Sequence, residues 1–215
     1  YMRPRTDRED LERYHEDLIV CSACIAGEVP AKILRDDIEG AREAIEWYKR
    51  VFGDDYYLEL QRHEVKDPNQ RANRETFPLQ QKANRVILQL AKEYGIKVVC
   101  TNDAHFVDKD NAEAHDHLLC LSTGRDLDDP NRMLYSKQEW FKTREEMNEV
   151  FADVPEALSN TIEILDKVET YSIDHAPIMP FFPIPKEFGT EEDTRRNITP
   201  EQLYHEFTSD ENGEN

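Results

Sequence analysis

Continuous apolar runs in the first half of the chain predict three buried strands. They lie at Asp17–Cys24, Tyr56–Gln61 and Lys97–Thr101. In each run, apolar residues occupy neighbouring positions instead of every second one. That pattern is typical of strands that are covered on both faces, as in a parallel sheet.

Between these runs, apolar residues return every three or four positions, which is the period of a helix with one buried face. This period predicts a helix at Asp37–Phe52 that ends at Gly53, and a longer helix at Gln70–Tyr94 that Pro78 opens or breaks. Shorter helices are predicted at Asp7–Asp17 (with Thr6 as N-cap), Glu28–Arg35 and Asn111–Leu121.

The alternation of strand and helix indicates the fold class. Each strand is followed by a connection that is long enough for a helix, which parallel strands require. The sequence therefore predicts an α/β fold built from βαβ units, with a parallel sheet or a barrel.

The pattern changes after Gly124. A polar loop is followed by two predicted helices, Thr143–Phe151 and Pro155–Lys167, and the first opens with a capping box of Thr143 and Glu146. We expect these helices to form a pair that packs on the sheet.

The C-terminal part has a different composition. Four prolines between Ala176 and Pro185 predict an extended connector. The remainder is acidic and polar, with one helix predicted at Pro200–Phe207. We therefore expect two parts, residues 1–175 and residues 176–215.

The charge balance limits the classes of partner. The chain has 27 basic and 46 acidic residues, a net charge of −19, and such a surface repels the phosphate backbone of nucleic acid. The chain can still belong to a larger nucleic-acid enzyme whose basic grooves lie elsewhere. No apolar run approaches the roughly 18 residues of a membrane span, and no signal peptide is evident, so the expected location is the cytoplasm. Because the first residue is Tyr1 and not Met, we expect a processed product or an excised piece.

The four cysteines are Cys21, Cys24, Cys100 and Cys120, and three of them lie in apolar runs. Buried free thiols explain this placement better than disulfides do. Cys21 and Cys24 have the spacing of a zinc knuckle, but the chain has no second pair of this kind, and an offset of three places the two sulfurs on opposite faces of a strand.

The segment VVCTNDAHF, Val98–Phe106, holds the clearest candidate site. Asp103 and His105 follow the end of a predicted parallel strand, where α/β folds place their sites. In an extended segment both side chains point to one side, with Cα atoms about 6.5 Å apart. A carboxylate with an imidazole suits Zn, Mn or Fe. The alternative is that Asp103 caps a turn and His105 packs on a loop, and the spacing alone favours this alternative.

Other candidates are less specific. Cys24 follows the first predicted strand and can supply a third ligand at the same edge, or it is a buried structural thiol. His115 and His117 lie two apart in a predicted helix, so we expect at most one to face inward. Glu59 can face the site or solvent, and His63 is equally ambiguous.

Five motifs follow one another along the chain: SAC-x2-GE at Ser22–Glu28, YYLELQ-x-H at Tyr56–His63, VVCTNDAHF at Val98–Phe106, AHDHLLCLSTG at Ala114–Gly124 and FADVPEALSNTIEI at Phe151–Ile164. In this order they resemble the alpha subunits of bacterial DNA polymerase III, and more narrowly the second half of their polymerase and histidinol phosphatase (PHP) domain. The resemblance runs from about Leu11 to Pro185.

The resemblance implies part of a (β/α)7 barrel with a metal cluster, Zn or Mn, at its mouth. Cys24 matches the family's cysteine ligand, and Asp103 and His105 match its Asp-x-His pair. Ala23 stands where the family often has Gly. The early ligands of the family, including a His-x-His motif, have no counterpart, so the site is expected to be incomplete and this chain alone inactive.

The resemblance also implies a function for the parent protein, which is DNA-directed DNA synthesis from deoxynucleotides with Mg. Within it, the PHP domain is either a proofreading 3′–5′ exonuclease or a structural module that binds other replisome subunits. Two alternatives remain open for this chain: a freestanding PHP-type phosphoesterase, and a non-catalytic replisome interaction module.

Overall fold

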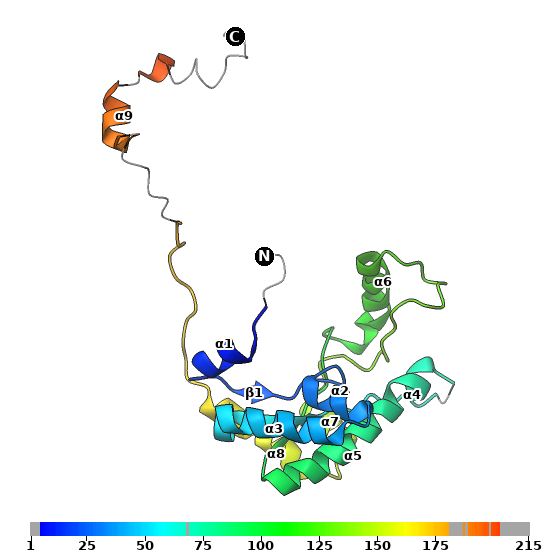
Figure 1. Ribbon diagram of the computed structural model, residues 1–215. Coiled ribbons are helices and arrows are strands. Elements are labelled where there is room, and N and C mark those ends of the chain that lie inside the picture. The colour runs from blue at the N-terminus through cyan, green and yellow to red at the C-terminus, as the bar shows by residue number, and fades with distance from the viewer. Residues whose placement is uncertain (1–4, 68, 181–186, 188, 198, 203–215) are drawn as a thin grey trace. The chain divides into compact units, whose positions relative to one another are not determined.

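In the residues that the structure describes, three parallel strands form the central sheet, in the order β1-β2-β3. They are β1 (Val20–Cys21), β2 (Tyr56–Leu60) and β3 (Val98–Cys100). The structure is a computed structural model and describes residues 5–67, 69–180, 187, 189–197 and 199–202 (Figure 1). In the register, Val20 lies opposite Tyr56 and Leu58 lies opposite Val98.

Helices fill the connections, as the periodicity predicts. They are α1 (Arg8–Arg13), α2 (Glu28–Leu34), α3 (Ile38–Phe52), α4 (Arg71–Glu75), α5 (Phe77–Tyr94), α6 (Ala112–Thr123), α7 (Arg144–Val150), α8 (Pro155–Lys167) and α9 (Glu191–Asn197), with single 3₁₀ turns η1 (Gly53–Asp55) and η2 (Lys109–Asn111). The parallel α/β class is thus confirmed. That the sheet is an arc of a seven-stranded barrel remains a prediction.

Several helix ends follow from their capping residues. Gly53 and Gly95 end α3 and α5 with φ of 57° and 60°, a conformation that glycine adopts without steric cost. At α7, the predicted capping box of Thr143 and Glu146 is present. These short-range signals confirm the predicted ends.

Other ends differ from the sequence prediction. Asp7, and not Thr6, is the N-cap of α1, because its carboxylate accepts a hydrogen bond from the backbone N–H of Asp10 at 3.0 Å. The predicted helix at 70–94 is two helices, and the break falls at Thr76 because Pro78 occupies the first turn of α5. The first strand covers only Val20–Cys21 of the predicted run.

The core lies between the sheet and the helices α2, α3 and α5, which run side by side (Figure 1). Leu58 and Leu60 of β2 are fully buried in it, and Tyr56 stacks on Tyr48 of α3 with ring centroids 5.0 Å apart. Tyr57 points the other way, and its hydroxyl donates to Glu163 of α8 at 2.7 Å. Strand β2 is therefore covered on both faces, as its continuous apolar run predicts.

The second predicted helix of the C-terminal pair covers β3. Asn160 of α8 donates a side-chain hydrogen bond to the carbonyl of Val98 at 2.8 Å. Ala157 of α8 is buried, as are Phe151 and Val154 just before this helix. Helix α8 thus packs on the sheet layer, in agreement with the prediction.

The structure divides into two units, Tyr1–Glu169 and Thr170–Asn215. Residues 170–180 have no regular structure and are exposed, while 181–185 of the predicted connector lie outside the described residues. Of the helix predicted at Pro200–Phe207, residues 200–202 are helical and the rest lies outside the described residues. Nothing in the structure tests the predicted domain boundary at 175/176. Among the described helices, none is both long and apolar enough to span a membrane.

Candidate metal-binding site

Asp103 and His105 lie side by side just beyond the carboxyl end of β3. The carboxylate oxygen Oδ1 of Asp103 is 3.6 Å from Nε2 of His105. Their side chains are 38% and 34% exposed, so both remain accessible from solvent. The sequence prediction that these two side chains share one side is borne out in their geometry.

The backbone reason differs from the predicted one. Strand β3 ends at Cys100, and Asp103 has a φ of 44°, so the segment is a turn and not an extended strand. Aspartate tolerates this left-handed region better than most residues do, because its short polar side chain can bond locally. A turn that Asp favours therefore brings the carboxylate to the imidazole.

A second segment holds this turn in place, and we call it the clamp segment, residues Ser136–Phe141. The side-chain amide of Asn102 donates to the carbonyls of Gln138 and Trp140 at 2.8 and 2.7 Å. The backbone N–H of His105 donates to the carbonyl of Glu139 at 2.8 Å. Phe106 and Trp140 form an isolated parallel bridge. The backbone on either side of Asp103 is thus fixed by hydrogen bonds to one segment.

Glu139 organises the clamp segment from inside. It is 2% exposed, and its Oε1 accepts hydrogen bonds from the backbone N–H of Ser136 at 3.0 Å and from the Ser136 hydroxyl at 2.5 Å. Among the described residues, its second oxygen, Oε2, has no hydrogen-bond partner. Neither Glu139 nor Asn102 is among the site residues that the sequence predicts.

His63 is a structural residue of this region and not a free ligand. Gln80 accepts from the His63 backbone N–H at 2.8 Å and donates to the ring Nδ1 at 3.0 Å, while Nε2 lies 3.0 Å from the Asn102 carbonyl. Both ring nitrogens are therefore satisfied in the neutral form. Burial lowers the pKa of His63, and the nearby Glu139 carboxylate only partly opposes this effect. The Glu139 carboxylate lies 3.5 Å from Nδ1 of His63, but the two do not form an ion pair because the His63 ring is neutral.

Aromatic rings form one wall of the site. The ring of Tyr135 packs edge-on against His105 and His115, with centroids 4.6 and 5.1 Å away. His117 is exposed and its Nδ1 lies 2.7 Å from the Glu113 carbonyl, so only His115 of the two helical histidines faces inward, as predicted.

Cys24 lies within electrostatic range of the Tyr135 hydroxyl. Burial is the main cause that raises the pKa of Tyr135, and the electrostatic influence of Asp103, Glu139 and Cys24 adds to it. Cys24 also lines a small pocket with Glu59. Within the described part of the chain, however, no three His, Cys, Asp or Glu side chains form a group that could hold a metal ion. A carboxylate and an imidazole are donor types that Zn and Mn accept, and that Asp103, His105 and Cys24 bind a metal remains a prediction.

The turn that carries Cys24 has strict backbone requirements. Gly27 donates its N–H to the Cys24 carbonyl at 2.8 Å, and a Cβ at Gly27 would lie 2.2 Å from the Ser22 carbonyl oxygen. Ala23 has a φ of 62°, which is strained for a residue with a Cβ. A glycine in place of Ala23 would adopt this φ without steric cost.

Glu59 does not face solvent. Its Oε1 accepts hydrogen bonds from Gln61 at 2.8 Å and from the Thr101 hydroxyl. Burial and the Glu59 carboxylate together raise the pKa of Cys21 to about 11, so this thiol stays protonated. All four cysteines are free, and nothing in the described residues resembles a zinc knuckle.

Comparisons with known proteins agree with the motifs. The PHP domain family matches residues 1–63. DNA polymerase III subunit alpha of Borreliella burgdorferi is 40% identical over 97% of this chain, and its namesakes from Campylobacter jejuni and Thermus aquaticus are 36% and 33% identical over 98% and 93%.

The chain is a homologue of the PHP region of DNA polymerase III alpha subunits. The chain spans less than a fifth of the length of these relatives, 18%, 17% and 16% respectively. The homology covers the β3 exit, the clamp segment and α8, since it extends over nearly the whole chain.

Proposed function

We propose that this chain is a segment of a DNA polymerase III alpha subunit and supplies one edge of its PHP metal site. The observation that carries the proposal is the pairing of Asp103 and His105, 3.6 Å apart, at the carboxyl end of a parallel strand in a homologue of that subunit. Identities of 40% and 36% to DNA polymerase III alpha subunits over 97% and 98% of this chain support a polymerase segment over a freestanding phosphoesterase.

The residues present would have distinct tasks. Asp103 and His105 would bind Zn or Mn through one carboxylate oxygen and Nε2, and Cys24 would add a thiolate. The clamp segment would hold the Asp103 turn before the ion arrives. A bound divalent metal would supply an activated water or stabilise charge on a phosphate oxygen. Other ligands would come from outside the described residues.

The parent protein would add deoxynucleotides to a primer elsewhere in its chain, and other replisome subunits would be its partners. The PHP site would then remove the 3′ end of DNA or serve as a structural module. The isolated 215-residue chain should bind metal weakly and should not hydrolyse DNA.

The test uses the full-length product of the reading frame that encodes this chain. We expect it to contain tightly bound divalent metal, and we expect Asp103→Ala to lose most of it in elemental analysis while primer extension persists. Asp153→Ala serves as a control, because Asp153 binds Arg62 and no site residue. Metal content that is unchanged in Asp103→Ala would contradict the proposal, and the 3′–5′ exonuclease rate of the wild type separates the catalytic from the structural role.

A further inference from the structure

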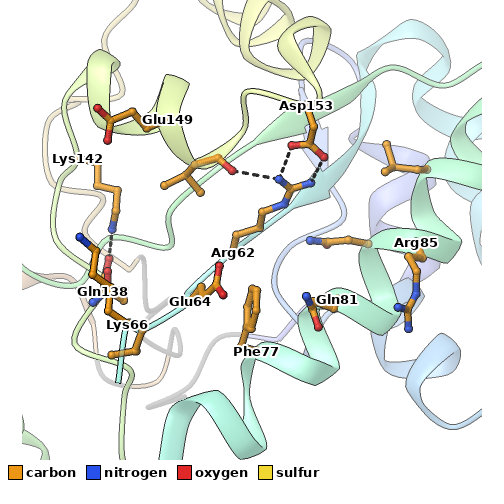
Figure 2. A pocket seen from close by; sticks show the side chains of 14 residues that line it. Arg62, Glu64, Lys66, Phe77, Gln81, Arg85, Gln138, Lys142, Glu149 and Asp153 are labelled. Carbon is orange, nitrogen blue, oxygen red and sulfur yellow. Dashed lines mark hydrogen bonds and ion pairs between the residues drawn. The ribbon is translucent and has the colours of Figure 1, made fainter. Parts of the chain in front are cut away.

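A second site is indicated by a cleft that Gln138 of the clamp segment helps to line. The cleft has a volume of about 780 Å³ and lies between the exit of β2, helix α5 and the region from the clamp segment to α7 (Figure 2). We call it the α5–α7 cleft. Its volume falls within the range of small-molecule sites.

Cations gather in the α5–α7 cleft although the chain is strongly acidic. Lys66, Arg85 and Lys142 line it, and within the described part of the chain none of the three forms an ion pair. Arg62 also lines it but is occupied, since it binds Asp153 through two hydrogen bonds of 2.5 and 2.9 Å (Figure 2). Three unpaired cations in one cleft of a chain with net charge −19 indicate an anionic ligand.

Lys142 is the most strongly constrained of these cations. Its ammonium lies 3.4 Å from the centre of the Trp140 ring and donates to the carbonyl of Gln138 in the clamp segment. Burial lowers its pKa to about 8. The carboxylates of Glu146 and Glu139 oppose this effect only in part, and neither forms an ion pair with Lys142, so an anion that binds beside the ammonium would stabilise it.

The other lining residues limit the size and charge of the anion. Glu64 and Glu149 also line the cleft and are exposed. Their two negative charges and the three positive charges of the cations named above leave a net charge of only about +1. A single phosphate group fits this balance, whereas a triphosphate would be repelled by the two carboxylates. The ring of Phe77 lies on the wall near the amide of Gln81 (Figure 2). An aromatic ring with an amide beside it can stack and hydrogen-bond a nucleobase.

We propose that the α5–α7 cleft binds a nucleoside monophosphate group, with the phosphate at Lys142 and Arg85 and the base against Phe77. The group is either a free mononucleotide or the terminal nucleotide of a single strand. The proposal does not depend on the metal edge, because none of the cleft residues belongs to it.

Calorimetric titration of the 215-residue chain with dAMP tests the proposal. We expect saturable binding with a Kd on the order of 1 mM or tighter, and weaker binding of dATP and of deoxyadenosine. Lys142→Gln and Arg85→Gln should each weaken dAMP binding about tenfold, the loss expected for one charge-assisted hydrogen bond. Phe77→Leu should weaken dAMP binding but leave binding of inorganic phosphate unchanged.

Lys92→Gln is the matched control, because Lys92 is exposed on the same helix and does not line the cleft. It should leave dAMP binding unchanged. An adenine tetranucleotide that binds more tightly than dAMP would identify a strand end as the ligand, and equal binding would identify the mononucleotide. Lack of saturation at about 10 mM dAMP, or an equal loss in Lys92→Gln, would overturn the proposal.

Discussion

At the scale of single residues, two left-handed backbone positions shape the candidate metal-binding site. Asp103 has a φ of 44° and Ala23 has a φ of 62°. Asp tolerates this region, whereas Ala has no polar side chain to compensate for it. The turn that carries Cys24 is therefore strained and the turn that carries Asp103 is not.

Replacement of Ala23 by Gly should stabilise the protein. Removing the Cβ relieves the steric cost at a φ of 62°, and we expect a gain of about 0.5–1 kcal/mol in the free energy of unfolding. Urea denaturation of the wild type and the variant measures this gain in unfolding free energy. The control is Ala26→Gly, because Ala26 lies in the same turn without a positive φ and should lose stability. Equal effects of the two substitutions would show that Ala23 is not strained.

At the scale of elements, the clamp segment links the β3 exit to the region before α7. Replacement of Asn102 by Ala would leave the carbonyls of Gln138 and Trp140 without their donor. We expect a loss of about 1–3 kcal/mol in unfolding free energy and faster amide hydrogen exchange at His105 and Phe141.

Asn148→Ala gives the matched control for this experiment, since Asn148 is exposed on α7. This substitution should change neither the unfolding free energy nor the amide hydrogen exchange at His105 and Phe141. If Asn102→Ala left exchange at His105 as slow as in the wild type, the clamp segment would not be what holds the Asp103 turn.

A largely buried ion pair ties helix α6 to the following loop. Arg132 donates to both carboxylate oxygens of Asp116 at 2.6 and 2.8 Å, and both side chains are 11% exposed. This pair lowers the pKa of Asp116 below its ordinary value of 3.8. The stabilisation is therefore fully present above pH 3.8 and is lost as the pH falls through the lower folded pKa.

Asp116→Asn should cost about 1.5–3 kcal/mol at neutral pH, the range for hydrogen bonds to charged groups. Between about pH 5 and pH 2.5, urea midpoints should fall more steeply for the wild type than for the variant. If the urea midpoints of the wild type and of Asp116→Asn fell equally as the pH is lowered, the ion pair would not stabilise the fold.

At the scale of the whole molecule, the sequence predicts the elements whose signals are local. The period of α3, the continuous apolar run of β2 and the capping box of α7 each depend on residues close in sequence, and each prediction is confirmed. The sequence does not predict helix α9, because its residues, EEDTRRN, carry no apolar stripe.

The candidate site was predictable only in part. The Asp-x-His spacing and the strand before it indicated Asp103 and His105. The role of Asn102 has no local signal, because its side chain bonds to the clamp segment more than 30 residues away in sequence. Glu139 bonds to Ser136 within an irregular segment, which has no period to indicate it. Such contacts follow from the tertiary fold and have no period.

The central claim is that Asp103 and His105 form one edge of a metal site, and Mn²⁺ titration followed by NMR tests it most directly. The chain has seven histidines, which serve as internal probes. We predict that substoichiometric Mn²⁺ broadens the ring resonances of His105 and His115 first, leaves those of His15 and His175 sharp, and loses this selectivity in Asp103→Asn. Broadening that is equal at all histidines, or unchanged in Asp103→Asn, would contradict the claim.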